Sequence, residues 1–209
     1  MRNTWRKIFA LALCAACMLS FPVMAVDFTD VSGHWAESYI TQAADRQLIQ
    51  GYGGLYSPDD NMTRSQLATI LWRACGSPEP KGEAAFTDLT QDWYKKPIAW
   101  AQENGVMNGT GEGKFGPEGT VTREQLATVL YRLAGSPMDA MLFTQFYDAD
   151  YPDSGAVSSY AKQAVYWSIY RQVYCGKSSL NVGKTLDPLE PASRGQIAVM
   201  IIRYLDRNQ

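Results

Sequence analysis

Histidine is almost absent from this chain and cysteine is scarce, which removes the usual nucleophile–base and metal-ligand sets. The 209 residues include one histidine, His34, and four cysteines. No Gly-x-Ser-x-Gly, His-Glu-x-x-His or cysteine–histidine pattern occurs. The acidic segment DADYPDSG, residues 148–155, lacks the sixth-position glycine and the closing glutamate of an EF-hand loop. The sequence therefore predicts a protein that is not an enzyme, with a solvated acidic loop and neither metal nor cofactor.

A strong excess of one charge is also missing. The chain has 19 basic and 21 acidic residues, a net charge of −2. Arg2, Arg6 and Lys7 lie within residues 1–25, which hold no acid, so without that segment the net charge is −5. Bulk charge of this sign excludes a nucleic-acid partner, because a polyanion needs a basic surface. Any recognition of an anion must be local.

Long apolar runs are lacking too, apart from residues 8–21. This run follows a basic start and precedes PVMA, with Val23 and Ala25 at the −3 and −1 positions of a cleavage site. That is the plan of a secretory signal peptide over residues 1–25, and the run is short for a membrane span. An uncleaved anchor is the alternative. Cleavage leaves an exported chain with no transmembrane segment.

Two cysteines, Cys75 and Cys175, remain outside the predicted signal peptide. An exported protein can pair them, but their separation in sequence does not show proximity. Cys75 aligns with Ala134 in the repeat described next, which favours a small buried thiol at that position.

What the sequence does contain is one segment written three times. NMTRSQLATILWRACGSP (61–78) returns as TVTREQLATVLYRLAGSP (120–137) and, more weakly, as PASRGQIAVMIIRYLDRN (191–208). The similarity extends upstream and predicts repeats over residues 26–78, 79–139 and 140–209. A period of this length indicates units that bury their faces against one another.

Fixed positions mark each copy. The copies open on FTDV at 28, FTDL at 86 and FYDA at 146, and share an aromatic residue, a glycine, a proline and two arginines, as follows: Trp35, Trp93, Tyr160; Gly51, Gly109, Gly176; Pro58, Pro117, Pro188; Arg64, Arg123, Arg194; Arg73, Arg132, Arg203. Only the loop between glycine and proline varies in length. Variable length is typical of a surface loop.

Each copy is predicted to fold as helix–loop–helix, which makes the chain all-α with strands that are short at most. Apolar residues recur at helical spacing, as in Ile40, Ala43, Ala44 and Leu48. The glycines at 51, 109 and 176 are predicted to cap the first helices at their C-termini. Trp35, Trp93 and Tyr160 are expected to pack in the core, with stacking on a sugar ring as the alternative.

The motif that opens each second helix combines a capping box with an arginine. Thr63/Gln66, Thr122/Gln125 and Ser193/Gln196 have the spacing in which hydroxyl and amide cap each other's backbone. The arginine between them lies at the positive end of the helix dipole, where a cation is disfavoured. Arg64, Arg123 and Arg194 therefore need a negative partner. Either unpaired helix amides and guanidinium together bind an external anion, or Asp30, Asp88 and Asp148 supply an internal one.

These residues resemble the S-layer homology (SLH) family, whose pattern is close to F-x-D-V…W-A…G…F-x-P…T-R-A-E. The first copy matches this pattern with the sequence FTDVSGHWAESYITQAADRQLIQGYGGLYSPDDNMTRSQLA. The resemblance implies a pseudo-threefold, three-pronged bundle with the second helices at its centre. It also implies non-covalent binding at the bacterial cell surface to secondary cell wall polysaccharide, often pyruvylated, in grooves between prongs.

The resemblance assigns the pyruvyl carboxylate to Arg64, Arg123 and Arg194, with the grooves led by Arg64 and Arg123 favoured. Groove support is expected from Asp30, Asp88, Trp35, Trp93, Gly51, Gly109, Gln66 and Gln125. Two departures stand out, because glutamine replaces the family's final glutamate in every copy and the third copy has Tyr160, Ser193 and a longer loop. They motivate the alternative of a secreted structural or protein-interaction scaffold with degenerate sugar grooves.

Overall fold

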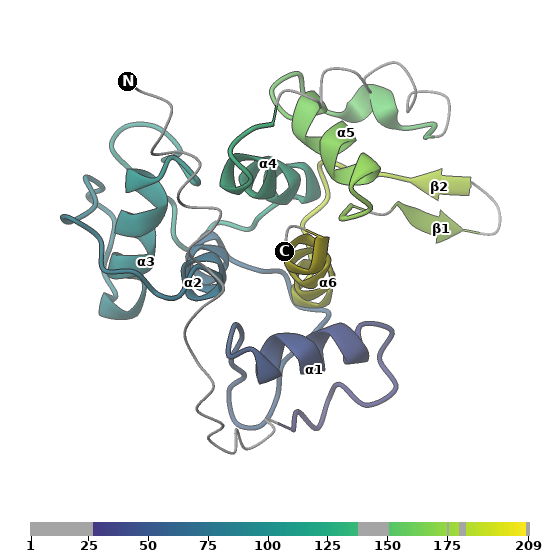
Figure 1. The fold of residues 1–209 in the computed structure, drawn as a ribbon, viewed down its shortest axis with the longest axis horizontal. Helices are drawn as coiled ribbons and strands as arrows, with labels where there is room; N and C mark the ends of the chain where they lie inside the picture. The colour runs from purple at the N-terminus through teal and green to yellow at the C-terminus, as the bar shows by residue number, and fades with distance from the viewer. Residues whose placement is uncertain (1–26, 138–150, 175, 180–182, 208–209) are drawn as a thin grey trace.

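The computed structural model describes residues 27–137, 151–174, 176–179 and 183–207. The predicted signal peptide, Asp148 and Cys175 lie outside these residues. The described chain is built from six α-helices, a 3₁₀ turn and one short hairpin (Figure 1): α1 Glu37–Asp45, α2 Arg64–Ala74, α3 Asp92–Glu103, α4 Arg123–Leu133, the 3₁₀ turn Ser154–Ala156, α5 Lys162–Tyr170, β1 Lys177–Ser179, β2 Gly183–Thr185 and α6 Arg194–Arg207. The all-α prediction is confirmed, and the antiparallel pair β1–β2 lies in the long loop of the third copy.

The helices pack in pairs that cross the copy boundaries. Helix α3 packs on α2, α5 packs on α4, and α1, the first helix, packs on α6, the last (Figure 1). Each first helix thus buries its apolar face on the second helix of the copy before it, and the two ends of the chain close the circle. Ile40, Ile98 and Val165 are examples of fully buried residues on the three first helices.

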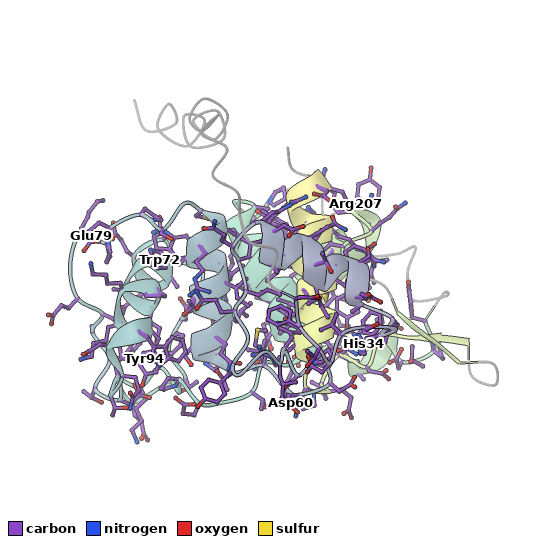
Figure 2. The ribbon with its side chains drawn as sticks, turned by 90° about the horizontal axis from the view of Figure 1, so that it is seen from below. His34, Asp60, Trp72, Glu79, Tyr94 and Arg207 are labelled. Atoms are coloured by element: carbon purple, nitrogen blue, oxygen red, sulfur yellow. The ribbon has the colours of Figure 1, made fainter. Side chains whose placement is uncertain are left out.

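A ring of three backbone hydrogen bonds joins the segments that precede the second helices. The amide of Met62 donates to Ala192 O (3.1 Å), Ala192 donates to Val121 O (2.8 Å), and Val121 donates to Met62 O (3.1 Å). All three side chains are buried. In Figure 2 Asp60, just before α2, lies at the lower edge of the molecule and Arg207, the last residue of α6, at the upper edge. The starts of α2, α4 and α6 therefore meet at one end.

The first helices end before the glycines that were predicted to cap them, so that prediction is wrong. Each first helix is instead followed by a residue with positive φ that lies four positions before the predicted glycine. These residues are Gln47 (57°), Gly105 (65°) and Gln172 (54°). The next amide then reaches back to the helix, as Leu48 does to Ala43 O at 2.9 Å. This is the Schellman arrangement, and two of its three left-handed residues are glutamines.

Gly51 and Gly109 are required for close approach instead. A Cβ atom on Gly51 would collide with the Phe28 ring and with Leu55 O, and one on Gly109 would collide with the Phe86 ring and with Lys114 O. The ring of each Phe-x-Asp turn thus lies directly on the glycine. Only a residue without a side chain fits there.

The aspartates of these turns hold the loops that follow. Asp30 accepts the amides of Tyr56 (2.8 Å) and Ser57 (2.6 Å), and Asp88 accepts those of Phe115 (2.9 Å) and Gly116 (2.8 Å). In the third copy Asp153 takes this place, accepting the amides of Leu186 and Asp187 at 2.9 and 2.7 Å. The turn that contains Asp153, YPD at 151–153, is therefore the equivalent of the FTD turns, whereas FYDA at 146, which was predicted to be the equivalent, lies outside the described residues.

Candidate ligand grooves

The predicted capping boxes are confirmed at α2 and α4. Gln66 and Gln125 donate their N3 amides to the hydroxyls of Thr63 and Thr122, and their side-chain oxygens accept the threonine amides at 3.1 Å. The same two bonds link Ser193 and Gln196 at the start of α6. In each box the glutamine oxygen faces the backbone, so its NH₂ group is the end left to face outward.

The remaining amides of each first turn are not open to an external anion, and this part of the prediction is wrong. In every copy, the arginine amide and the amide after it donate to loop carbonyls of another copy. Arg64 and Ser65 reach Gly119 O and Pro117 O, Arg123 and Glu124 reach Glu190 O and Pro188 O, and Arg194 and Gly195 reach Asp60 O and Pro58 O, all at 2.8–3.0 Å. The helix starts are therefore bonded to their neighbours.

The guanidinium groups donate to backbone carbonyls of the same loops. Arg64 reaches Phe115 O through Nε (2.9 Å) and Asn108 O through Nη2 (2.6 Å). Arg194 reaches Tyr56 O and Gln50 O at 2.7 and 3.4 Å. Buried Arg123 reaches Leu186 O at 2.8 Å.

An aromatic ring lies under each arginine at 4.5–4.7 Å from its Cζ. Arg64 and Arg194 use the ring of the residue whose carbonyl they bind, Phe115 and Tyr56. The third loop has Leu186 at that position, and Tyr174 supplies the ring under Arg123 instead. Tyr174 also donates its hydroxyl to Leu186 O at 2.7 Å. The cation–π contact thus persists although the sequence position that provides it has changed.

Each of these contacts pairs a guanidinium donor with an uncharged acceptor. Neither Arg64 nor Arg194 has an ion pair within 4.0 Å in the described part of the chain. The alternative of a direct pair with Asp30 or Asp88 is not found there, because those carboxylates bind loop amides. Burial would raise the pKa of Asp88, but the amide bonds from Phe115 and Gly116 outweigh it and hold that pKa below its usual value. Burial lowers the pKa of Arg64, which stays protonated.

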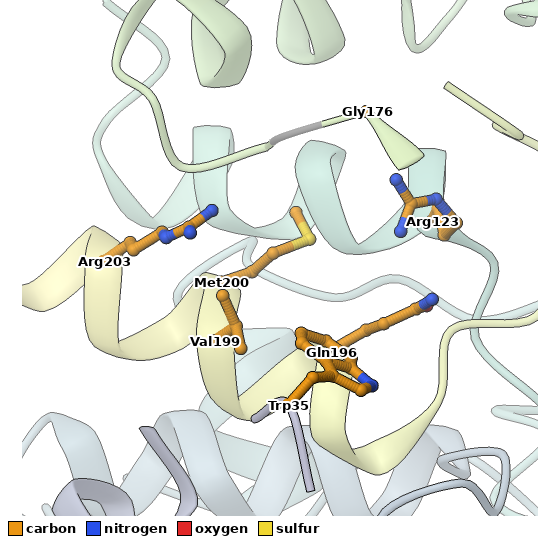
Figure 3. Close-up of a pocket in the computed structure, with 7 residues that line it drawn as sticks. All are labelled: Trp35, Arg123, Gly176, Gln196, Val199, Met200 and Arg203. Carbon is orange, nitrogen blue, oxygen red and sulfur yellow. The ribbon is translucent and has the colours of Figure 1, made fainter. Parts of the chain in front are cut away.

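A pocket of about 420 Å³ lies beside Arg123 (Figure 3). We call it the Arg123 groove; its lining is Trp35, Arg123, Gly176, Gln196, Val199, Met200 and Arg203. These residues come from four parts of the chain: the entry to α1, the start of α4, the third loop and α6. Figure 3 places Arg123 and Arg203 at opposite ends, with Met200 between them. The lining among the described residues includes two arginines and no acid.

A second pocket, of about 340 Å³, lies beside Arg194. This Arg194 groove is lined by Gln50, Gly51, Tyr52, Leu55, Tyr56, Ser57, Asp60, Asn61, Gln66 and Arg194. Its arginine, glycine and glutamine correspond to Arg123, Gly176 and Gln196 of the other pocket. Asp60 makes this groove less positive than the Arg123 groove.

The aromatic residues that open the first helices are exposed, so the expectation of core packing is wrong. Trp35 is 63% exposed, Trp93 52% and Tyr160 57%. Trp35 lines the Arg123 groove. Sequence reasoning missed Val199, Met200 and Arg203 as groove residues, although Arg203 belongs to the second arginine series and its fixed offset from Arg194 was a usable signal.

His34 has a structural role in the turn before α1. Its Nδ1 accepts the Ala36 amide at 3.1 Å, and its Nε2 lies 3.3 Å from the Asp59 carboxylate. Gly195 packs against the imidazole, where a Cβ would lie 3.2 Å from Cε1. Cys75 is a free, half-buried thiol, and burial raises its pKa to about 11. Within the described residues no helix has the length and apolarity to cross a membrane, and no His, Cys, Asp and Glu cluster suits a metal.

Comparison with known proteins identifies this architecture. The family model for the S-layer homology domain matches residues 27–68 and 85–127. The chain belongs to the S-layer homology family. Among its relatives, an S-layer protein of Bacillus licheniformis is 33% identical over 156 residues, covering 70% of this chain and 18% of the relative. The surface-layer 125 kDa protein of Lysinibacillus sphaericus is 29% identical over 214 residues, covering 98% of this chain and 17% of the relative.

An endoglucanase of a Bacillus strain, KSM-635, is 29% identical over 183 residues, covering 87% of this chain and 19% of the relative. This chain thus spans less than a fifth of the length of each of these relatives. The SLH family is a non-catalytic binding module for cell-wall polysaccharide, and the relatives are surface-layer proteins as well as an enzyme. The match supports a module for anchoring at the cell surface.

Proposed function

We propose that this SLH chain attaches non-covalently to a pyruvylated secondary cell wall polysaccharide, and that the Arg123 groove is its principal site. The observation that carries the proposal is the combination of two arginines, an exposed indole and an amide donor around a pocket whose described lining contains no acid. This combination suits an anionic sugar.

Each part of the ligand has a matching group. The carboxylate of a ketal-linked pyruvate is a planar anion, the kind of group that a guanidinium positioned as Arg123 is, with Nε on Leu186 O, binds through charge-assisted hydrogen bonds. The pyranose ring presents an apolar face that stacks on the Trp35 indole. The outward NH₂ group of Gln196 donates to a ring hydroxyl.

The affinity of one groove is expected to be modest. A hydrogen bond to a charged group contributes about 1.5–3 kcal/mol before ordering costs. The Arg194 groove has the same kind of arginine and glutamine on another side of the bundle. A polymer that engages both grooves gains through effective concentration without any further contact.

Export is part of the same proposal. Residues 1–25 act as a cleaved signal peptide and deliver a non-catalytic chain to the wall. A structural or protein-interaction scaffold with degenerate grooves is the competing function, favoured by Asp60 in the Arg194 groove.

Wall binding distinguishes the two functions. We expect the purified chain to sediment with native walls and to bind depyruvylated walls far less. Trp35→Ala should weaken binding without loss of stability, because the side chain is exposed, whereas Tyr170→Ala, an exposed aromatic that lines neither pocket, should not. Equal binding to both wall preparations would reject the pyruvate mechanism, and wild-type retention by Trp35→Ala would favour the scaffold.

A further inference from the structure

The residue after each groove arginine differs between copies, being Ser65, Glu124 or Gly195. It lies in the first turn of its helix, next to the capping glutamine. Only α4 has an acid in that turn, whereas α2 and α6 have none. This position thus differs in the surface beside Arg64, which we call the Arg64 groove. We define it by Arg64, Gly109 and Gln125, the counterparts of residues that line both pockets, and by Tyr160, the counterpart of Trp35.

Glu124 is buried and both of its oxygens are engaged. The residue is 2% exposed, Oε2 accepts the Ser158 amide at 2.9 Å, and Oε1 accepts the Tyr160 hydroxyl at 2.8 Å. The bonds span 34 and 36 residues, so they fix the entry to α5 onto the start of α4. A carboxylate at this place is also stabilised by the helix dipole.

The hydrogen bond from the Tyr160 hydroxyl to Glu124 sets the aromatic residue of this groove apart from those of the other copies. Trp35 and Trp93 are exposed rings, and among the described residues neither indole nitrogen donates a hydrogen bond to the start of a second helix. Tyr160 is tied to Glu124 by its hydroxyl, and burial together with that bond raises the pKa of Tyr160 to about 12. The phenol thus remains a neutral donor, anchored to the carboxylate at all ordinary pH values.

The charge of Glu124 also makes the Arg64 groove less favourable for an anion. The start of α4 contributes positive potential to the Arg64 groove beside Gln125, and the Glu124 carboxylate offsets it from within the first turn. At the equivalent place the Arg123 groove has uncharged Gly195 and the Arg194 groove has uncharged Ser65.

Given the proposed function, on which this inference rests, we propose that the Glu124–Tyr160 pair makes the Arg64 groove unable to accept the anionic glycan. Glu124 is a positioning and specificity-determining residue. It fixes the exposed Tyr160 ring by its hydroxyl and offsets local positive charge, so the three grooves are not equivalent and glycan binding is confined to the grooves of Arg123 and Arg194.

The test is a site-resolved NMR titration of the full chain with a pyruvylated N-acetylhexosamine methyl glycoside, and with its unpyruvylated form as the control ligand. In the wild type we expect the Gln196 side-chain amide and the Trp35 indole signal to shift with the pyruvylated probe. The Gln125 side-chain amide should not shift at the probe concentration that saturates the other two. Titration of Gln125 in step with Gln196 would overturn the inference alone, whereas no shift at Gln196, Trp35 or Gln125 would overturn the proposed function and the inference with it.

Two variants test the pair directly. Glu124→Ser/Tyr160→Trp installs the residues found at the equivalent positions of the first and second copies, Ser65 and Trp93, and should make the Gln125 signal and the introduced indole respond to the probe. Glu124→Gln keeps the side-chain shape and removes the charge, so it should restore part of the response if the double variant does not fold. Glu118→Ser, which removes an acid from an exposed loop position, should leave the Gln125 signal unresponsive. A folded Glu124→Gln or double variant whose Gln125 signal still ignores the probe would also overturn the inference.

Discussion

One aspartate in each copy binds the backbone amides of the loop whose carbonyl groups accept hydrogen bonds from a groove arginine. Asp88 binds the amides of Phe115 and Gly116, and Phe115 then presents its carbonyl to Arg64. The carboxylate thus acts on the groove through the backbone, as Asp30 does for Tyr56 and Arg194. A charged acceptor for two amides contributes more than a neutral one, because hydrogen bonds to ionised groups are stronger.

Replacing Asp88 by asparagine should therefore destabilise the fold by about 1–3 kcal/mol at pH 7, since an amide oxygen can serve only one of the two donors well. The folded-state pKa of Asp88 is depressed, so its contribution is complete above the unfolded-state pKa of about 3.9 and is lost as pH falls through the folded value. Urea unfolding at pH 7, 4 and 3 should show a smaller loss of stability on acidification for Asp88→Asn than for the wild type. An identical acid dependence of the two proteins would contradict this role.

At the scale of elements, glycines and caps decide where helices and loops meet. Gly109 lets the Phe86 ring and the carbonyl of Lys114 approach the chain from two sides. The capping boxes begin α2 and α4 at the residue where the neighbouring loops bond to them. Both features set the position of a helix start relative to a loop, which is the geometry of a groove.

Gly109→Ala should cost about 1–3 kcal/mol, because the added methyl must displace an aromatic ring and a backbone carbonyl. Gly82→Ala is the matched control, since nothing lies within 4 Å of the added atom and φ is not positive. Thermal and urea unfolding of the two variants should separate them clearly. Equal stability of Gly109→Ala and wild type would mean that the loop relaxes at no cost.

The capping box at the start of α4 makes its own contribution to stability. Thr122→Ala removes the hydroxyl that accepts the Gln125 amide and should cost about 1 kcal/mol. Thr122→Ser, which keeps the hydroxyl, should retain most of the stability in the same unfolding measurement. A loss as large for serine as for alanine would attribute the effect to the methyl group.

The whole molecule is closed by contacts between its first and last helices. Helix α1 packs on α6, Arg46 pairs with Asp206 at 2.7 Å, and the ring through Met62, Val121 and Ala192 links all three copies. Such an arrangement differs from an open repeat array, in which the end units unfold separately. Circular closure predicts one cooperative unit.

Ile201→Ala, a change at a fully buried residue of α6, should cost about 2–5 kcal/mol. Its effect should spread, so that amides of α3, which pack on α2, exchange faster together with those of α1. Hydrogen exchange followed residue by residue measures this, with exposed Leu189→Ala as the control. Wild-type protection in α3 alongside lost protection in α1 would show that the copies unfold independently.

The sequence by itself determined the all-α class, the apolar faces and the capping boxes, because each of these depends on residues within about one helical turn of one another. It also located the arginines at the starts of the second helices. It did not determine where the third copy's aspartate lies, since the loop lengths vary there and Asp153 is recognisable only by the amides that it binds.

Only the tertiary structure decided what the arginines touch and which aromatic residues are exposed. The acceptors of Arg64 lie 44 and 51 residues away and those of Arg194 138 and 144, so no local pattern specifies them. The physical reason is that backbone carbonyls are present at every residue and carry no signature in sequence. Which of them a guanidinium meets, and whether Trp35 faces solvent or core, follows from how the helices close into a ring.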